Sequence, residues 1–242
     1  MMALDKLNNL GQYPLEGIEE FIAECIAHDV HEINLTGTNT DPSLYQHHEK
    51  LAIYLQMAIP NLRLGLRTNG VALERIKRIA PFYEKASISV PSFDPEIYVK
   101  CMGQGEPPDI RTLKGLFEDI KVNLVLSPFI PENDLWKTLN MLADLGIRRV
   151  NLREPYGQDH VGNPLGKRLT QTGTVLGMPE YDCDTTKFIY WDVHYVEVES
   201  VNLYAQGRIS VDYPITRGHD TEGTVLDQSH FTTGRHVQQW VK

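Results

Sequence analysis

The chain has 242 residues, a formal net charge of −9 and 23% charged residues, which suits one large domain or one domain with a small appendage. The acidic balance argues against a nucleic-acid partner, because such binding needs a basic surface that displaces counterions from phosphates. No apolar stretch approaches the roughly 20 residues that cross a bilayer. The start MMALDKLNNLGQYP lacks the apolar segment of a secretory signal, and three cysteines are too few for a disulfide framework. We therefore expect a cytoplasmic protein with no membrane partner.

The first part of the chain alternates between helical and strand patterns. The stretch 15–28 has apolar residues at Ile18, Phe21, Ile22 and Ile26, which is helical spacing. Further helices are predicted at 43–57, 71–79, 95–101, 110–120 and 132–145, and short apolar strands at 31–35, 62–66, 86–90, 122–126 and 149–152. Strands joined through helices predict an α/β fold with a parallel sheet, because parallel neighbours need crossover connections. Their apolar runs indicate strands that are buried on both faces.

Two features depart from a simple series of β-α units. The series opens with a helix, which predicts that one strand and its loop are absent on the amino-terminal side. From about residue 161 the pattern becomes β-rich, and FIYWDVHYVEVESVNLYAQGRISVDYPI predicts antiparallel strands with a turn at Gln206-Gly207. We predict two units, 1–160 and a small β-rich carboxyl-terminal extension at 161–242, with a short helix at 233–241.

Polar residues follow the predicted strands. In α/β folds ligands bind at the carboxyl ends of strands, where these residues converge. They are Thr36, Gly37, Thr38 and Asn39 after the first strand, Thr68 and Asn69 after the second, Ser89 in the third, Asn123 in the fourth, and Arg153 with Glu154 after the fifth. They suit a polar ligand such as a nucleoside with an amino-acid tail. The alternative is that Ser, Thr, Asn and Gly occur here only because turns favour them.

Four motifs occur in a characteristic order: INLTGTNTDPSLY, LGLRTNGV, ASISVPSFDPEIYVKCMG and KVNLVLSP. Together they resemble the radical S-adenosylmethionine superfamily, in the branch that includes the molybdenum-cofactor-biosynthesis cyclases. The resemblance covers about residues 15–154. It implies a partial (β/α)6 TIM-like barrel of which this chain holds strands 2 to 6, with S-adenosylmethionine and a [4Fe–4S] cluster as cofactors.

The resemblance also implies roles for the residues at the strand ends. Residues 36–39 would meet the methionyl amino group of the cofactor. Thr68 and Ser89 would contact its carboxylate or ribose, and Asn123 would lie toward the sugar. The expected cofactor-binding set is Thr36, Gly37, Thr38, Asn39, Thr68, Asn69, Ser89, Asn123 and Arg153.

The chain departs from the family in its cluster motif. The family holds its cluster with Cys-x-x-x-Cys-x-x-Cys, whereas this chain has only Cys25, Cys101 and Cys183, far apart in sequence. We expect no metal ligand among them and expect Cys25 to be a packing residue. The Gly-Gly-Glu-Pro loop of the family is replaced by 37–40 with Asp41 behind it, and Asp41 is a candidate substitute for the missing carboxylate. Pro91 stands where the family has the Asp of Ser-Leu-Asp.

Two functions are compatible with these observations. The first is a radical S-adenosylmethionine enzyme, truncated here at its amino terminus, that forms a deoxyadenosyl radical, acts on a small molecule or peptide and needs a reductant protein. The second is a cluster-free, inactive barrel that binds a nucleotide-like metabolite or acts as a scaffold. A hydrolase or aldolase barrel is a third idea that rests on fold analogy alone.

Two other polar groups are interpreted as surface features. His47-His48-Glu49 lacks the spacing of a metalloprotease motif and is predicted to be a solvated helix face. Asp192 and His194 share one strand face by their period of two, and exposed strand positions are the favoured interpretation over a metal site or an acid/base pair.

Overall fold

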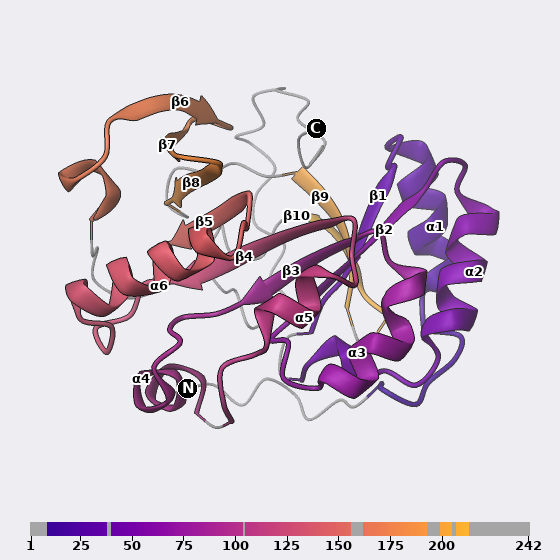
Figure 1. Cartoon of the computed structure of the whole chain (residues 1–242). Coiled ribbons are helices and arrows are strands. Elements are labelled where there is room, and N and C mark those ends of the chain that lie inside the picture. Colours follow the sequence, from indigo (N-terminus) through magenta and orange to yellow (C-terminus); the bar gives the residue numbers. More distant parts are fainter. Residues whose placement is uncertain are drawn as a thin grey trace.

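The computed structural model describes residues 9–37, 40–103, 105–155, 162–192, 199–204 and 207–212. Its centre is an eight-stranded sheet with the order β1-β2-β3-β4-β5-β8-β7-β6 (Figure 1). The parallel strands are β1 (Glu32–Leu35), β2 (Arg63–Thr68), β3 (Lys85–Ser89), β4 (Asp119–Val125), β5 (Arg149–Arg153) and β8 (Thr186–Trp191). The predicted α/β fold with a mostly parallel sheet is confirmed.

Helices connect the strands. They are α1 (Ile18–Ala27), α2 (His48–Ala58), α3 (Leu73–Ile79), α4 (Pro95–Met102), α5 (Ile110–Lys114) and α6 (Glu132–Asp144), with 3-10 turns η1 (Pro42–Leu44), η2 (Ala80–Phe82) and η3 (Leu165–Lys167). Asp94 starts α4 by accepting hydrogen bonds from the backbone N–H groups of Glu96 and Ile97, with Pro95 at the first helical position. No helix in the described part of the chain is both long and apolar enough to span a bilayer.

Two predicted helices are shorter than the apolar spacing suggested. The helix predicted over 43–57 is interrupted, because Tyr45 is extended (φ −57°, ψ 139°) between η1 and α2. The helix predicted over 110–120 ends at Lys114, and β4 already begins at Asp119. In both places an apolar pattern continued through a change of backbone conformation.

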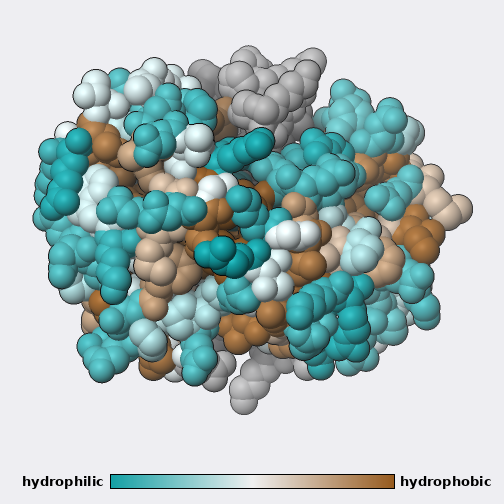
Figure 2. Space-filling model, in the orientation of Figure 1, coloured by the Kyte–Doolittle hydropathy of each residue, from teal (hydrophilic) through white to brown (hydrophobic). Residues whose placement is uncertain are grey.

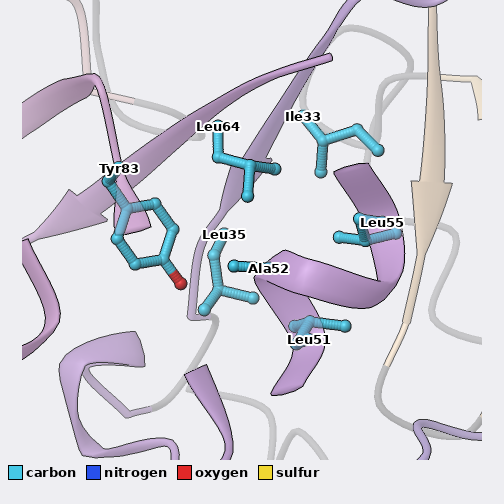
Figure 3. Close-up of a pocket in the computed structure, with 7 residues that line it drawn as sticks. All are labelled: Ile33, Leu35, Leu51, Ala52, Leu55, Leu64 and Tyr83. Atoms are coloured by element: carbon cyan, nitrogen blue, oxygen red, sulfur yellow. The ribbon is translucent and has the colours of Figure 1, made fainter. Parts of the chain in front are cut away.

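The sheet has one apolar and one polar face. The apolar side chains of the parallel strands lie under the helices; they include Ile33, Leu35, Leu64, Leu66, Ile88, Val122, Leu124, Val150 and Leu152. Helices α3, α5 and α6 lie in front of this face in Figure 1, and Figure 3 shows α2 against β1 and β2. The opposite, polar face carries alternate residues such as Arg67, Ser87 and Lys121. Ser87 and Asn151 on this polar face are nevertheless buried, so the central strands are buried on both faces as predicted, although only one face is apolar.

Strand β8 differs from the prediction for the carboxyl-terminal part. It pairs in parallel with β5, with Val150 opposite Phe188, so FIYW belongs to the main sheet. On its other side it pairs antiparallel with β7 (Met178–Cys183), with Tyr181 opposite Phe188, as the sequence predicted for this stretch. The antiparallel strands β7 and β6 (Gln171–Val175) then extend the sheet beyond β8. Six parallel strands lie within the described residues, one more than the sequence predicted.

A separate hairpin consists of β9 (Glu199–Leu203) and β10 (Ile209–Asp212). It confirms the predicted antiparallel pairing on either side of Gly207, which has a φ of +75°. The hairpin packs on α1, where a Cβ at Gly17 would lie 2.4 Å from the Gly207 carbonyl oxygen. The predicted helix at 233–241 and His194 lie outside the described residues. On the molecular face in Figure 2, apolar residues lie in small groups between hydrophilic ones.

The sequence predicted that His48 belongs to a solvated helix face, but His48 is buried. Its side chain is 4% exposed, and its Nδ1 lies 2.6 Å from the Tyr83 hydroxyl. The rings of Tyr45 and Tyr83 approach it edge-on. Burial lowers the pKa of His48 from 6.5 to about 4, because a charged imidazolium in this aromatic cluster loses its hydration.

This burial predicts a pH-dependent loss of stability. Between pH 6.5 and about 4, His48 is protonated in the unfolded chain and neutral in the folded chain. The free energy of unfolding should therefore decrease as the pH is lowered through this window, by on the order of 3 kcal/mol in total. Urea unfolding at a series of pH values measures this, and His48→Gln should flatten the difference. Identical pH profiles for the wild type and His48→Gln would contradict the assignment.

Candidate functional site

Asp41 joins the loops that follow β1 and β2. Its carboxylate accepts hydrogen bonds from the Ser43 N–H at 2.9 Å, the Thr68 hydroxyl at 2.8 Å and the Asn69 N–H at 2.7 Å. The Thr68 hydroxyl in turn accepts a bond from the Gly70 N–H at 3.1 Å. Asp41 therefore caps η1 and fixes the turn after β2 at the same time.

Both loops need a glycine at their tightest point. A Cβ at Gly37 would lie 1.7 Å from the Thr40 carbonyl oxygen, so only glycine fits this turn after β1. Gly70 has a φ of +77°, and a Cβ there would lie 2.8 Å from the side chains of Pro108 and Leu113. The Thr-Asn-Gly motif thus has a packing reason in this fold.

The register of the parallel strands places polar side chains of the polar face in rows. One row consists of Arg67, Ser87, Lys121 and Arg149. The next row toward the carboxyl ends consists of Ser89, Asn123 and Asn151, and Arg153 follows opposite Val125. The Asn123 amide donates to the Ser87 hydroxyl at 2.5 Å, which joins the two rows.

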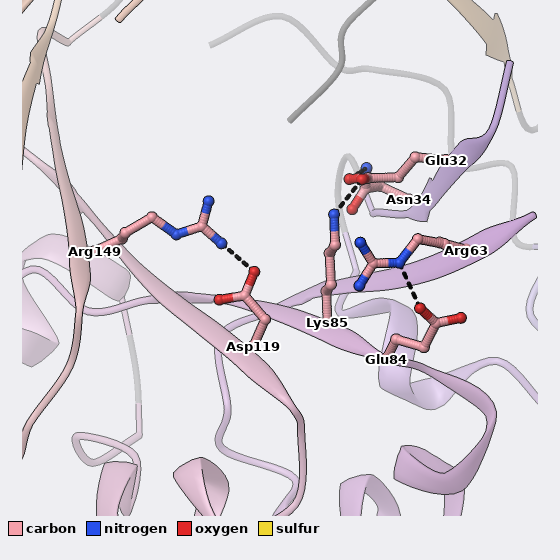
Figure 4. A network of polar contacts seen from close by, with 7 residues as sticks. All are labelled: Glu32, Asn34, Arg63, Glu84, Lys85, Asp119 and Arg149. Atoms are coloured by element: carbon pink, nitrogen blue, oxygen red, sulfur yellow. Dashed lines mark hydrogen bonds and ion pairs between the residues drawn. The ribbon is translucent and has the colours of Figure 1, made fainter. Parts of the chain in front are cut away.

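The amino ends of the strands carry ion pairs on the same face. Lys85 pairs with Glu32, Arg149 pairs with Asp119, and Arg63 donates to Glu84 at 2.6 Å. Figure 4 shows the side chains of Lys85, Glu32, Asp119 and Arg149 on one side of the sheet. A Cβ at Gly65 would lie 2.2 Å from the Asn34 amide oxygen, so the Asn34 side chain lies over this glycine. These residues form the closed, charge-balanced end of the polar face.

Lys121 lies between these ion pairs and the carboxyl ends. The pKa of its amine is held well below its usual range, first because of burial. The positive charges of Arg67, Arg149 and Arg153 lower this pKa further, whereas Glu32 raises it. Four cations are thus close enough to interact electrostatically. The sequence analysis missed this group, although the period of two in LRLGLRT, DIKVNLV and RRVNLR contains the signal.

The structure brings most of the predicted cofactor-binding residues to one edge of the sheet. Thr36 and Gly37 are exposed after β1, whereas Thr38 and Asn39 lie outside the described residues. Thr68 is 3% exposed and its hydroxyl is engaged by Asp41, so the structure gives it a positioning role. The predicted contacts of these residues with a cofactor stay predictions.

The remaining predicted residues lie further along this edge. Asn69 is half-buried, and its amide oxygen accepts from the Val71 N–H at 3.0 Å. Ser89 and Asn123 are register partners on β3 and β4, both half-buried. Arg153 ends β5, opposite Trp191 of β8, and its backbone carbonyl accepts a hydrogen bond from the Leu126 N–H at 2.9 Å.

Glu154 and Asp192 are buried and belong to packing around β8. Glu154 accepts the Tyr190 hydroxyl at 2.5 Å and the Gly162 N–H at 3.3 Å. The Glu154 side chain is directed toward β8, whereas the preceding residue, Arg153, lies on the polar face of the sheet. Asp192 is 5% exposed and its N–H contacts the Met178 sulfur at 3.4 Å, so the expectation of an exposed strand position is wrong for Asp192.

The three cysteines do not have the chemistry of a cluster site. Cys25 is fully buried on α1, and burial raises the pKa of its thiol to about 12, as suits a packing residue. Cys101 lies on α4 with a thiol pKa that burial also raises, and Cys183 lies on β7. The three cysteines lie on different elements, α1, α4 and β7, so they do not form the short three-cysteine loop that holds a cluster. Within the described ranges no group of three His, Cys, Asp or Glu side chains could hold a metal ion.

The apolar side of the sheet contains one small cavity that is no ligand site. It lies between α2 and β1–β2, has a volume of about 20 Å³, and is shown in Figure 3. Its lining residues are Ile33, Leu35, Leu51, Ala52, Leu55, Leu64 and Tyr83. This is room for about one water molecule in an apolar setting that would leave water without enough partners. The polar face is therefore the better candidate site.

Comparisons with known proteins give limited further information. Neither the family models nor the curated proteins that were searched contain a match to this chain. A crystal structure of Streptococcus suis SuiB bound to S-adenosylmethionine is 12% identical, with a TM-score of 0.49 over 65% of this chain and 38% of that chain. A crystal structure of methylornithine synthase (PylB) is 15% identical, with a TM-score of 0.46 over 61% and 46%. The chain spans less than half the length of these proteins.

The Asp41–Thr68 contact predicts a measurable stability effect. Thr68→Val keeps the side-chain volume but removes the hydroxyl that bridges Asp41 and the Gly70 N–H. The Gly70 N–H then loses its partner and Asp41 loses one of its three donors, which should lower the free energy of unfolding by about 1–3 kcal/mol, measured by urea titration. Thr40→Val, the same change at an exposed neighbouring site, should stay within about 0.5 kcal/mol of the wild type. Equal stability of the two variants would show that the contact contributes nothing.

Proposed function

We propose that this chain is the S-adenosylmethionine-binding part of a radical S-adenosylmethionine-type protein with a partial (β/α)6 barrel. The observation that carries the proposal is the convergence of Asn69, Ser89, Asn123 and Arg153 on the carboxyl edge of β2 to β5. Asn69, Ser89 and Asn123 come from three of the motifs that resemble the superfamily, in the same order, and Arg153 follows the last motif.

The donor set at this edge fits the groups of S-adenosylmethionine. Arg153 would hold the carboxylate, because a guanidinium donates paired hydrogen bonds to such a group. Ser89 and Asn123 offer a hydroxyl and an amide for the ribose hydroxyls. The exposed turn at Thr36 and Gly37 would meet the methionyl amino group through backbone carbonyls, which Asp41 helps to orient by capping η1.

The cysteines of this chain do not fit a [4Fe–4S] cluster, so we derive no radical step from these residues. Bound to such a cluster, S-adenosylmethionine supplies a deoxyadenosyl radical. A longer form of the protein that carries Cys-x-x-x-Cys-x-x-Cys would act as the enzyme, on a small molecule or peptide and with a reductant protein as its partner. The chain of 242 residues would bind the cofactor without radical chemistry.

A second candidate function is a cluster-free barrel that binds a nucleotide-like metabolite or acts as a scaffold. The buried thiol of Cys25 and the dispersed positions of Cys101 and Cys183 favour it. The two functions share the ligand edge and differ only in the cluster. Sequencing the DNA immediately upstream of the Met1 codon separates the two functions. An in-frame segment that encodes a β-strand followed by the three-cysteine motif supports the enzyme. A stop codon close upstream, without this motif, supports the cluster-free protein.

Cofactor binding is tested by calorimetric titration of the 242-residue chain with S-adenosylmethionine. Arg153→Gln should weaken binding about tenfold or more, because it removes a charge-assisted hydrogen bond to the carboxylate. Arg148→Gln, which removes the same charge from an exposed position just before β5, is the matched control and should bind as the wild type does. If wild-type protein takes up no S-adenosylmethionine, or if both variants bind equally well, the proposed ligand edge is wrong.

A further inference from the structure

The chain contains a single Asn-Gly dipeptide, Asn69-Gly70, in the loop that follows β2. Asparagine is a chemically labile residue, and a following glycine makes it more labile, because glycine has no Cβ to shield its backbone nitrogen. That nitrogen is a nucleophile for the side-chain amide carbon of the asparagine. The chemical lifetime of this dipeptide therefore depends on how the fold holds the two reacting groups.

The side chain of Asn69 is prepared for such an attack. Its Oδ1 accepts a hydrogen bond from the Val71 N–H at 3.0 Å. Negative charge develops on this oxygen when a nucleophile adds to the amide carbon, and an N–H donor aimed at such an oxygen lowers the barrier. Asn69 is also only half-buried, so water can reach the product of the attack.

The nucleophile, in contrast, is blocked by a hydrogen bond. The Gly70 N–H donates to the Thr68 Oγ1 at 3.1 Å, and the Thr68 hydroxyl in turn donates to Asp41 at 2.8 Å. The bond to Thr68 engages the proton that the Gly70 nitrogen must lose before it can attack. Thr68 is 3% exposed and Gly70 is buried, so a base from solvent has little access to this proton.

Packing around Gly70 opposes the rotation that would free its nitrogen. A Cβ at Gly70 would lie 2.8 Å from the side chains of Pro108 and Leu113. The Asp41 carboxylate accepts the Asn69 N–H at 2.7 Å, which fixes the preceding peptide plane. In such a close-packed setting the backbone has little room to turn the Gly70 nitrogen toward the Asn69 side chain.

We propose that Asn69-Gly70 is a deamidation site that the Thr68 hydroxyl keeps closed. When the hydrogen bond from Gly70 to Thr68 opens, the Gly70 nitrogen loses its proton and forms a bond to the Asn69 Cγ. The Cγ–Nδ2 bond breaks and ammonia leaves, which gives a succinimide. Water then opens this ring to aspartate or isoaspartate. The net reaction consumes water and releases ammonia, and it needs no oxidant or cofactor.

Deamidation would change the edge of the sheet on which this loop lies. The new carboxylate adds a negative charge to the residue whose N–H is bound by Asp41, and like charges repel. An isoaspartate also inserts a side-chain carbon into the backbone just before Gly70, whose φ is +77°. The Thr68 hydroxyl therefore protects both the conformation and the chemical identity of the turn. This inference does not rest on the proposed function.

Deamidation is measured by mass spectrometry of the 242-residue chain after incubation in mildly alkaline buffer, with a sample taken before incubation as the blank. Trypsin releases residues 68–75, which contain the dipeptide. The native wild type should deamidate about tenfold or more slowly than the urea-unfolded chain. Thr68→Val should accelerate deamidation of the native chain about tenfold, because the hydroxyl is lost. Thr68→Ser keeps the hydroxyl and should stay near the wild-type rate.

Ile147→Val is the control for a general loss of stability. Ile147 is completely buried in the segment before β5, so this variant weakens the core without touching the loop after β2, and it should deamidate as the wild type does. If Thr68→Val lacks native circular dichroism, Asp41→Asn, which weakens the hold on the Thr68 hydroxyl, takes its place and should also accelerate deamidation.

Three results would each overturn the proposal. The first is a native wild type that deamidates as fast as the unfolded chain. The second is a wild-type rate in folded Thr68→Val, or in Asp41→Asn where that variant replaces it. The third is equal acceleration in Thr68→Val and Ile147→Val, which would assign the effect to unfolding and not to the hydroxyl.

Discussion

The register of the parallel strands is the constraint on which the rest of the structure depends. Side chains alternate along each strand, so a slip of one residue would exchange the two faces of the sheet. Burial of Leu66, Ile88 and Val122 under the helices prevents such a slip, because each is completely removed from solvent. The same register then places Arg67 and Lys121 on the opposite face. Packing on one face thus determines the chemistry of the other.

Much of the fold was predictable because its local signals agree. Helical spacing predicted α1, α3 and α6, and short apolar runs predicted β1 to β5 within a few residues. The failures occur where one local pattern is compatible with two structures. FIYW is compatible with antiparallel or parallel pairing, and in the structure it has one neighbour of each kind, β7 and β5. The apolar residues between Ile110 and Ile120 span a helix, a turn and the start of β4.

The candidate site was predictable in position and less so in content. The rule that ligands bind at carboxyl strand ends pointed to Asn69, Ser89, Asn123 and Arg153, which do lie along one edge. It did not distinguish ligand contacts from residues that hold loops together. Thr68 belongs to the second class, since its hydroxyl bonds to Asp41 across 27 positions of the sequence. Such a long-range partner leaves no local signal.

The same limitation explains why the cations of the polar face were missed. Lys121 stands alone between the apolar residues Ile120 and Val122, and a single charge in a strand suggests an edge or a strand end. Only the pairing of β2, β3, β4 and β5 assembles the charges into a row. Ion pairs at the amino ends then balance one end of this surface. The grouping of these charged residues is therefore a property of the topology of the sheet.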